Sequence, residues 1–350
     1  MMEFYLVSQQ LEIIGIIDTY KSAIWTTRYY ESGDFELYVP ATAELLSLIQ
    51  KRQFVVRMDD LTKAMVIEGI KLSTEADSGD YLTITGRSIS SILSSRIVWA
   101  QTTYNGYVEK IMRRMVADAF IEPLILERTV SIMALGTELG IQDKAKMQFT
   151  GDSVESAIQS ICKSYKLGYD VLMDLANKKI RFVVYKGEDR SYGQNVNPFV
   201  VFSPDFENLI STEYSNSDAK FKNVAQIAGE GEGIARKKTV VGSASGLERF
   251  EVYVDARNQS TNSGEIDDAT YLSILAQKGT EKLAALSTVE SVDSEVAPNH
   301  TYVLGRDYFI GDVVEIINEY GIAMTPRVVE VIECQDEAGY TCIPTFATDD

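Results

Sequence analysis

The sequence predicts a β-rich α+β fold in which two strand-dominated segments enclose a smaller mixed segment. Residues 1–100 and 199–350 contain short runs of β-branched and aromatic residues separated by turn residues, a pattern typical of barrels and sandwiches. Residues 101–198 contain two amphipathic helical stripes followed by a hairpin pattern. The 350 residues suffice for two to three domains of about 150 residues each. We therefore predict domains at 1–100, 101–198 and 199–350.

Residues 1–100 are predicted to form strands around one short helix. The helix is expected over Ala43–Gln50, with Thr42 as its N-cap. Leu82 and Ile84 alternate with threonines, as expected for a half-buried antiparallel strand. The predicted strands are Tyr5–Val7, Leu11–Ile17, Ser22–Tyr30, Phe35–Val39, Gln53–Met58, Ala64–Leu72 and Tyr81–Gly86.

Residues 101–198 are predicted to form two helices and a hairpin. One helix is expected over Tyr107–Phe120, where apolar residues recur at three- and four-residue spacing. The second is expected over Ser153–Lys166, with a capping-box pair of Asp152 and Glu155 and a C-cap at Gly168. The predicted hairpin strands are Tyr169–Leu175 and Lys179–Tyr185.

Residues 199–350 return to strands, with one inserted or flanking helix at about residues 268–286. Asp267 or Asp268 is its expected N-cap, and Gly229–Gly233 is expected at a hairpin tip. Residues 347–350 are expected to fray. The predicted strands are Phe199–Phe202, Leu209–Tyr214, Asn223–Ala228, Thr239–Gly242, Phe250–Asp255, Ser287–Val296, Asp312–Glu319, Arg327–Glu333 and Tyr340–Ile343.

The charge is strongly acidic and unevenly distributed along the chain. The formal net charge is −18. Residues 1–100 carry 13 acidic and 9 basic side chains, and residues 101–200 carry 12 and 13. Residues 201–350 carry 26 acidic and 11 basic side chains, a net charge of −15. Such a surface disfavours tight nucleic-acid binding, although it allows nucleic acid to slide past without sticking.

No catalytic, cofactor-binding or metal site is predicted. The single histidine, His300, lies among loop-forming residues, and the cysteines Cys162, Cys334 and Cys342 are too widely spaced for a metal-ligand pair. The Gly229–Gly233 loop lacks the Lys-Ser/Thr of a phosphate-binding loop, and its two glutamates would repel phosphate. We therefore expect no enzyme and no cofactor.

No apolar run approaches the roughly 20 residues that span a bilayer, and the N-terminus lacks the basic region of a signal peptide. We therefore expect no membrane span and synthesis in a reducing cytoplasm.

Local segments of the sequence resemble the baseplate-hub family of phage tails, specifically the N-terminal hub portion of siphophage tail-associated proteins. The order of β, α+β and β segments also agrees with that family over nearly the whole chain. The segments that carry the resemblance are Gly33–Pro40, Leu82–Ser88 followed by Ile92–Leu93 and Arg96–Trp99, Tyr214–Val224, and Phe309–Val314.

The resemblance implies a structural virion protein, a homotrimeric baseplate hub that closes the distal end of the tail tube. Residues 1–100 and 199–350 would each form a tail-tube-like β-barrel, so that three copies adapt a sixfold ring to threefold symmetry. Residues 101–198 would lie away from the axis or on the distal side. The implied partners are tube or distal tail ring proteins, the tape measure protein, and tail-fibre or receptor-binding proteins.

The resemblance also implies a place at the tail tip of the virion, after synthesis in the host bacterial cytoplasm, with roles in host cell attachment and DNA ejection. DNA would pass through a central channel only in transit. We predict that acids of residues 201–350 contribute to the wall of this channel and repel the DNA. Many relatives carry a C-terminal extension that degrades cell wall or binds a receptor; because this chain ends at Asp350, any lysin activity is expected on another chain.

Three alternatives remain open at this point. A hub of a contractile tail or bacteriocin-like particle would share the fold and would be distinguished by a surrounding sheath. A tail-associated cell-wall hydrolase using two carboxylates would release fragments from peptidoglycan. A carbohydrate-binding tail protein would bind host cells directly.

Overall fold

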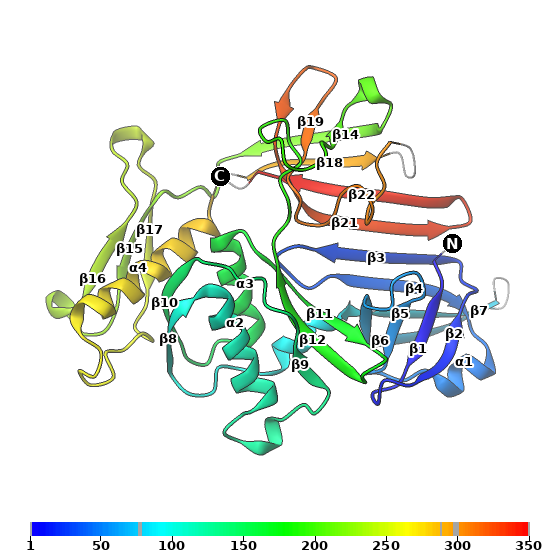
Figure 1. Cartoon of the computed structure of the whole chain (residues 1–350), viewed down its shortest axis with the longest axis horizontal. Coiled ribbons are helices and arrows are strands. Elements are labelled where there is room, and N and C mark those ends of the chain that lie inside the picture. Colours follow the sequence, from blue (N-terminus) through cyan, green and yellow to red (C-terminus); the bar gives the residue numbers. More distant parts are fainter. Residues whose placement is uncertain (1, 76–78, 288, 297–300, 349–350) are drawn as a thin grey trace.

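The computed structural model of the chain has a β-rich α+β architecture built on one sheet of eleven strands. It describes residues 2–75, 79–287, 289–296 and 301–348. In Figure 1 the sheet occupies the right-hand side, with helices α2 (Val108–Val116) and α3 (Val154–Tyr165) in the centre. Helix α4 (Asp268–Ala284) lies on the left beside a small sheet. The predicted fold class is thereby confirmed.

The eleven-stranded sheet combines strands from both ends of the chain. Strand β3 (Ser22–Arg28) pairs antiparallel with β21 (Arg327–Asp336), so one sheet runs through both predicted barrel segments. The domain boundaries themselves stay predictions. In pairing order the strands are β14 (Leu209–Ser217), β18 (Val289–Val296), β22 (Gly339–Ala347), β21, β3, β4 (Asp34–Pro40), β7 (Gly79–Ser88), β6 (Ala64–Glu75), β5 (Phe54–Arg57), β1 (Phe4–Val7) and β2 (Ile13–Ile17).

The N-terminal half of this sheet curls over itself. Phe4 of β1 stacks on Trp25 of β3 with ring centroids 5.8 Å apart, although four other strands separate β1 from β3 in the pairing order. Helix α1 (Ala43–Leu48) begins at the predicted N-cap Thr42, whose hydroxyl accepts the Leu45 N–H at 3.1 Å. Each large side chain buried in the curl contributes about 1.5–3 kcal/mol. The enclosed core includes Phe4, Leu6, Trp25, Phe35, Leu37, Leu82 and Ile84.

The middle segment contains both predicted helices, but α3 is capped differently from the prediction. Ser153 is the N-cap and accepts the Ser156 N–H at 3.0 Å, whereas Glu155 is buried. The helix ends at Lys166, which adopts a left-handed φ of 54°, and the predicted C-cap Gly168 instead begins a strand. The strands of this segment are β8 (Thr102–Tyr107), β9 (Met133–Leu135), β10 (Lys144–Phe149), β11 (Gly168–Asp174) and β12 (Lys179–Tyr185).

A small sheet covered by α4 packs against the middle segment, where α4 lies against β10 and α3. Gln148 donates to the Ser260 carbonyl at 3.0 Å and accepts the Ser260 N–H at 2.7 Å. The chain leaves the large sheet after β14 and returns in β18, where Ser217 and Val289 stand opposite each other. The N-cap Asp267 and the hairpin tip at Gly229–Gly233 are as predicted. The strands in pairing order are β16 (Lys238–Val241), β15 (Val224–Ala228) and β17 (Glu251–Asp255).

Another small sheet covers the C-terminal strands of the large sheet. Phe202 lies 5.3 Å from Tyr308 and 5.4 Å from Phe346, measured between ring centroids. The strands of this sheet are β13 (Val201–Phe202), β19 (Glu315–Ile317) and β20 (Ala323–Met324). The shorter helical turns are Ile89–Ser95 (η1), Ala117–Ile121 (η2, a π-helical turn), Leu126–Arg128 (η3), Pro204–Phe206 (η4), Gly233–Ala235 (η5) and Gly246–Glu248 (η6).

The three segments of the chain meet at Tyr29, which is fully buried just after β3. Its hydroxyl donates to the Lys166 carbonyl at 3.0 Å and accepts the Gly187 N–H at 3.3 Å. Its backbone N–H donates to the Val329 carbonyl at 2.9 Å. Gly311 lies against the ring so closely that a Cβ there would stand 2.2 Å from it. One side chain therefore joins the N-terminal, middle and C-terminal segments.

We predict that Gly311→Ala lowers the free energy of unfolding by about 2–4 kcal/mol. The φ of Gly311 is +92°, and an added methyl group would also collide with the Tyr29 ring. Gly305→Ala is the control, because Gly305 has a φ of +82° but open space around its Cβ position. Urea unfolding measures both variants; an equal loss in the two would contradict the role given to Tyr29.

Candidate functional surface

The described residues contain no assembled metal centre. No group of three or more His, Cys, Asp or Glu side chains is placed to hold a metal ion within them. Cys162 and Cys342 are buried, and burial raises the pKa of the Cys342 thiol to about 11 and that of Cys162 further. Thiols with raised pKa values are poor nucleophiles at neutral pH. His300 lies outside the described residues.

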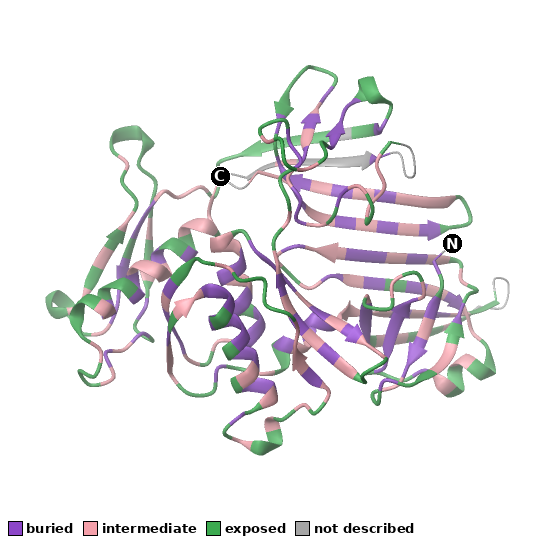
Figure 2. Ribbon diagram, in the orientation of Figure 1, coloured by how far each residue is buried: buried purple, intermediate pink, exposed green. Residues whose placement is uncertain are grey.

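The feature most suited to function is the face of the large sheet that its own chain leaves partly open. Register places Thr85, Glu36, Ile24, Cys334 and Thr341 in one row across β7, β4, β3, β21 and β22. These side chains are half-buried or exposed, whereas the alternate residues on the same strands are mostly buried. Figure 2 shows this alternation as buried and intermediate stripes along the strands. We call this surface the open face.

Charged side chains on the open face neutralise one another across strands. Arg28 of β3 donates to Asp34 of β4 and to Glu330 of β21, each at 2.5 Å. Arg87 of β7 forms a two-pronged contact with Glu68 of β6, with N–O distances of 2.8 and 3.0 Å. Hydrogen bonding to Arg87 lowers the pKa of Glu68. The open face is therefore polar, with much of its charge paired.

A buried ionic cluster lies on the opposite, covered face and joins strands from both ends of the chain. Arg57 of β5 donates to Glu333 of β21 at 2.6 Å and to Asp59 at 2.6 and 2.8 Å. The Tyr340 hydroxyl donates to Glu333 at 2.9 Å. Burial opposes the charge on Arg57, but Asp59 and Glu333 together raise its pKa. The cluster fastens the curled N-terminal strands to β21.

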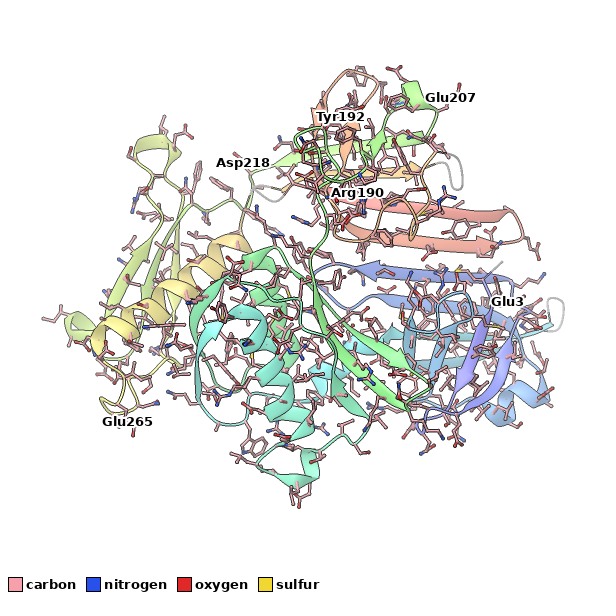
Figure 3. All side chains as sticks on the ribbon, in the orientation of Figure 1. Glu3, Arg190, Tyr192, Glu207, Asp218 and Glu265 are labelled. Atoms are coloured by element: carbon pink, nitrogen blue, oxygen red, sulfur yellow. The ribbon has the colours of Figure 1, made fainter. Side chains whose placement is uncertain are left out.

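A second ionic cluster involves the segment Phe309–Val314, one of the segments on which the family resemblance depends. Asp312 accepts from Arg190 at 2.6 Å and from the Glu188 N–H at 2.7 Å, and both charged side chains are buried. Figure 3 labels Arg190 where the linker from the middle segment passes the C-terminal strands. Gly311 and Asp312 thus have structural roles, fitting against Tyr29 and holding this linker.

A cleft of about 250 Å³ lies between β3, β6, β11 and residues 304–310. Asp60, Lys63 and Asp170 contribute charged groups to its lining. Burial raises the pKa of Asp170 to about 6, opposed by the Val171 N–H, which donates to it at 2.7 Å, and by Lys63. The cleft therefore holds a carboxyl group whose pKa is raised to about 6.

The acids of residues 201–350 lie in several places. Glu330 is on the open face and paired with Arg28, while Glu333 and Asp312 are buried. Others lie exposed near β14 or on the small sheet with α4, as Figure 3 shows for Glu207, Asp218 and Glu265. The predicted role of these acids in a channel wall stays a prediction.

Several side-chain contacts that hold the fold together were absent from the sequence-based predictions. The Arg236 guanidinium donates to the carbonyls of Ala228 and Gly229 and to Asp255. It therefore fixes the hairpin tip. Tyr29, Arg57 and Arg190 were not singled out, because a lone tyrosine or arginine in a strand gives no local signal of a distant partner.

Comparison with known proteins gives one family and several similar folds. The family model described as Siphovirus ReqiPepy6 Gp37-like protein matches residues 3–347. No curated protein sequence matches the chain. Among the described residues, no helix has the length and apolar character needed to cross a membrane.

Similar solved structures include three proteins described as tail proteins. One is from Neisseria meningitidis MC58 (TM-score 0.64, 13% identity, 99% of this chain and 97% of that chain). Another is the 43 kDa tail protein of prophage MuSo2 from Shewanella oneidensis (TM-score 0.61, 13% identity, 99% of both chains). A third is prophage tail protein gp18 from Listeria monocytogenes EGD-e (TM-score 0.57, 12% identity, 99% of this chain and 94% of that chain). At these identities the comparison shows a shared fold.

We predict that Glu333→Gln lowers the free energy of unfolding by about 2–4 kcal/mol, because it removes a buried charge partner of Arg57. The control is Glu337→Gln, whose partner Lys21 is exposed, so that little change is expected. Urea unfolding compares the two variants. Similar small losses in both would show that the buried cluster does not fasten β5 to β21.

We predict that stability depends on pH through Asp170. Its pKa is raised from 3.8 to about 6, so between pH 4 and 6 the folded protein retains a proton that the unfolded chain loses. The contribution of this group to stability therefore falls as pH rises through that window. The side chain of the Asp170→Asn variant stays neutral at every pH, like the protonated carboxyl group. Above pH 6 its free energy of unfolding should therefore exceed that of wild type by about 1–3 kcal/mol. Unfolding at pH 4 and 7 measures the difference, and an equal difference at both pH values would refute the assignment.

Proposed function

Because the chain belongs to the family of Siphovirus ReqiPepy6 Gp37-like proteins, we propose that it is a structural protein of a phage tail and forms a homotrimeric hub at the distal end of the tail tube. The observation that carries this proposal is the single sheet that runs through both strand-rich segments and leaves one face partly open. The shared fold with three solved tail proteins supports it.

The arrangement of the sheet suits a ring built from three copies. Each copy supplies two strand-rich halves that meet where β3 pairs with β21. Three copies would supply six halves, the number needed to match a sixfold ring in the tube above. Ring-forming contacts of this kind leave each copy with the same environment.

The part of the open face formed by β4, β3, β21 and β22 is the proposed wall of the DNA channel. It carries Asp34, Glu36, Glu330 and Asp336, and two of these acids are paired with Arg28. A wall with paired charges and a surplus of carboxylates would neither attract the phosphate backbone strongly nor bind bases. DNA would then pass without being held.

The proposed position also defines the proposed partners. A hub would contact tube or distal tail ring proteins above, the tape measure protein within, and tail-fibre or receptor-binding proteins around it. The protein would lie at the tail tip or baseplate of the virion, where it would contribute to host attachment and DNA ejection.

We expect the purified chain to form trimers. Sedimentation velocity and native mass spectrometry at micromolar concentration should give three times the chain mass of 39.0 kDa. Electron microscopy of the trimer should then show Glu36 and Asp336 facing the threefold axis. A chain that stays monomeric and never joins a tail would contradict the hub; a trimer with these acids on its outer surface would contradict only the channel wall.

A further inference from the structure

A groove of about 480 Å³ lies where β5 and β6 meet the turn η1 and residues 130–132. Its lining contains three arginines, Arg52, Arg87 and Arg96, and one carboxylate, Glu68. Such a concentration of positive charge is unusual in a chain with a net charge of −18. We call this feature the arginine groove.

Glu68 neutralises only one of these arginines. Its two carboxylate oxygens accept from Arg87, and this lowers the pKa of Glu68. Within the described part of the chain, neither Arg52 nor Arg96 forms an ion pair with a carboxylate. The Arg96 guanidinium donates to the Ser95 carbonyl at 3.0 Å, while its buried Nε has no hydrogen-bond partner there. The groove thus retains unused donors suited to a carboxylate.

A further arginine adds to the positive charge beside the groove. Arg128 lies near Arg96, and burial together with the Arg96 charge lowers the pKa of Arg128. Its guanidinium donates to the Ile97 carbonyl at 2.6 Å and lies 5.3 Å from the Trp99 ring centroid. This arrangement leaves its charge without a carboxylate partner in the described part of the chain.

The opposite end of the same sheet carries unpaired acids. Strand β14 is a free edge, and Figure 2 shows it exposed along most of its length. The side chains of Glu207, Glu213 and Asp218 are exposed and form no ion pair with described residues. Figure 3 shows Glu207 and Asp218 near the two ends of this edge strand. We call these three residues with β14 the acidic edge.

We propose that the arginine groove of one copy receives the acidic edge of a second copy, so that copies join head to tail. The groove lies toward one end of the strand order and the acidic edge forms the other end. A contact between two different surfaces of the same chain closes into a ring when the rotation allows it. This proposal rests on the homotrimer and names the surfaces that form it. Opposite charges on the two surfaces would also speed and orient the encounter.

The test is a charge swap measured by sedimentation velocity. Arg52→Glu/Arg96→Glu should raise the concentration for half-maximal assembly about tenfold or more, and so should Glu213→Lys/Asp218→Lys. The fourfold variant that combines both changes should restore assembly, because every contact regains opposite charges. Restored assembly cannot result from misfolding. Wild-type assembly should also weaken as salt rises from 50 to 500 mM.

Lys238→Glu/Lys282→Glu is the matched control, because it makes the same charge change at exposed positions on β16 and α4. It should assemble like wild type. If wild type forms trimers and the groove variant forms them equally well, or the fourfold variant fails to recover, the proposal is overturned while the hub remains. If wild type never assembles, the hub proposal itself fails. Binding of a fluorescent DNA duplex that is lost in the groove variant, with assembly unchanged, would assign the groove to nucleic acid and also overturn the proposal.

Discussion

The pairing of β3 with β21 is the constraint on which the rest of the structure depends. It joins residues about 300 positions apart in the chain, such as Arg28 and Glu330. Closing so long a loop costs conformational entropy, which local strand pairing alone offsets poorly. Further interactions near the β3–β21 pairing offset this entropic cost. The Tyr29 hydroxyl bonds to the middle segment, and Arg57 of β5 forms an ion pair with Glu333 of β21.

The ion pairs between charged side chains also make the register of the β3–β21 pairing specific. A shift of one residue would turn Glu333 to the open face and leave Arg57 with Asp59 alone. It would also separate Arg28 from its two carboxylates, which lie on the neighbouring strands on either side. The hydrophobic core and both ionic groups therefore favour one alignment. That alignment decides which side chains the open face presents.

Local sequence patterns predicted much of this fold, but they could not predict contacts between residues far apart in the chain. The period-two alternation of β4 and β7, the helical stripes of α2 and α3 and the caps at Thr42 and Asp267 all depend on near neighbours, and the structure contains them. The short strands β8 and β10 were missed because their partners lie about 40 residues apart and neither alternates clearly. Nothing in the sequence of β3 indicates β21 as its partner. The open face could not be predicted from the sequence either, because it forms only when strands from both ends of the chain pair.

The residues between β14 and β18 form a part of the structure that is separate from the large sheet. The last residue of β14 stands opposite the first residue of β18, so the intervening residues leave the large sheet and return to the same point. A two-residue turn could join these strands without altering their pairing. The small sheet with α4 is thus an insertion into a hairpin, joined to the large sheet through β14 and β18 and packed on the middle segment. A change in the length or sequence of the loops on this inserted sheet would therefore leave the strand pairing of the large sheet intact.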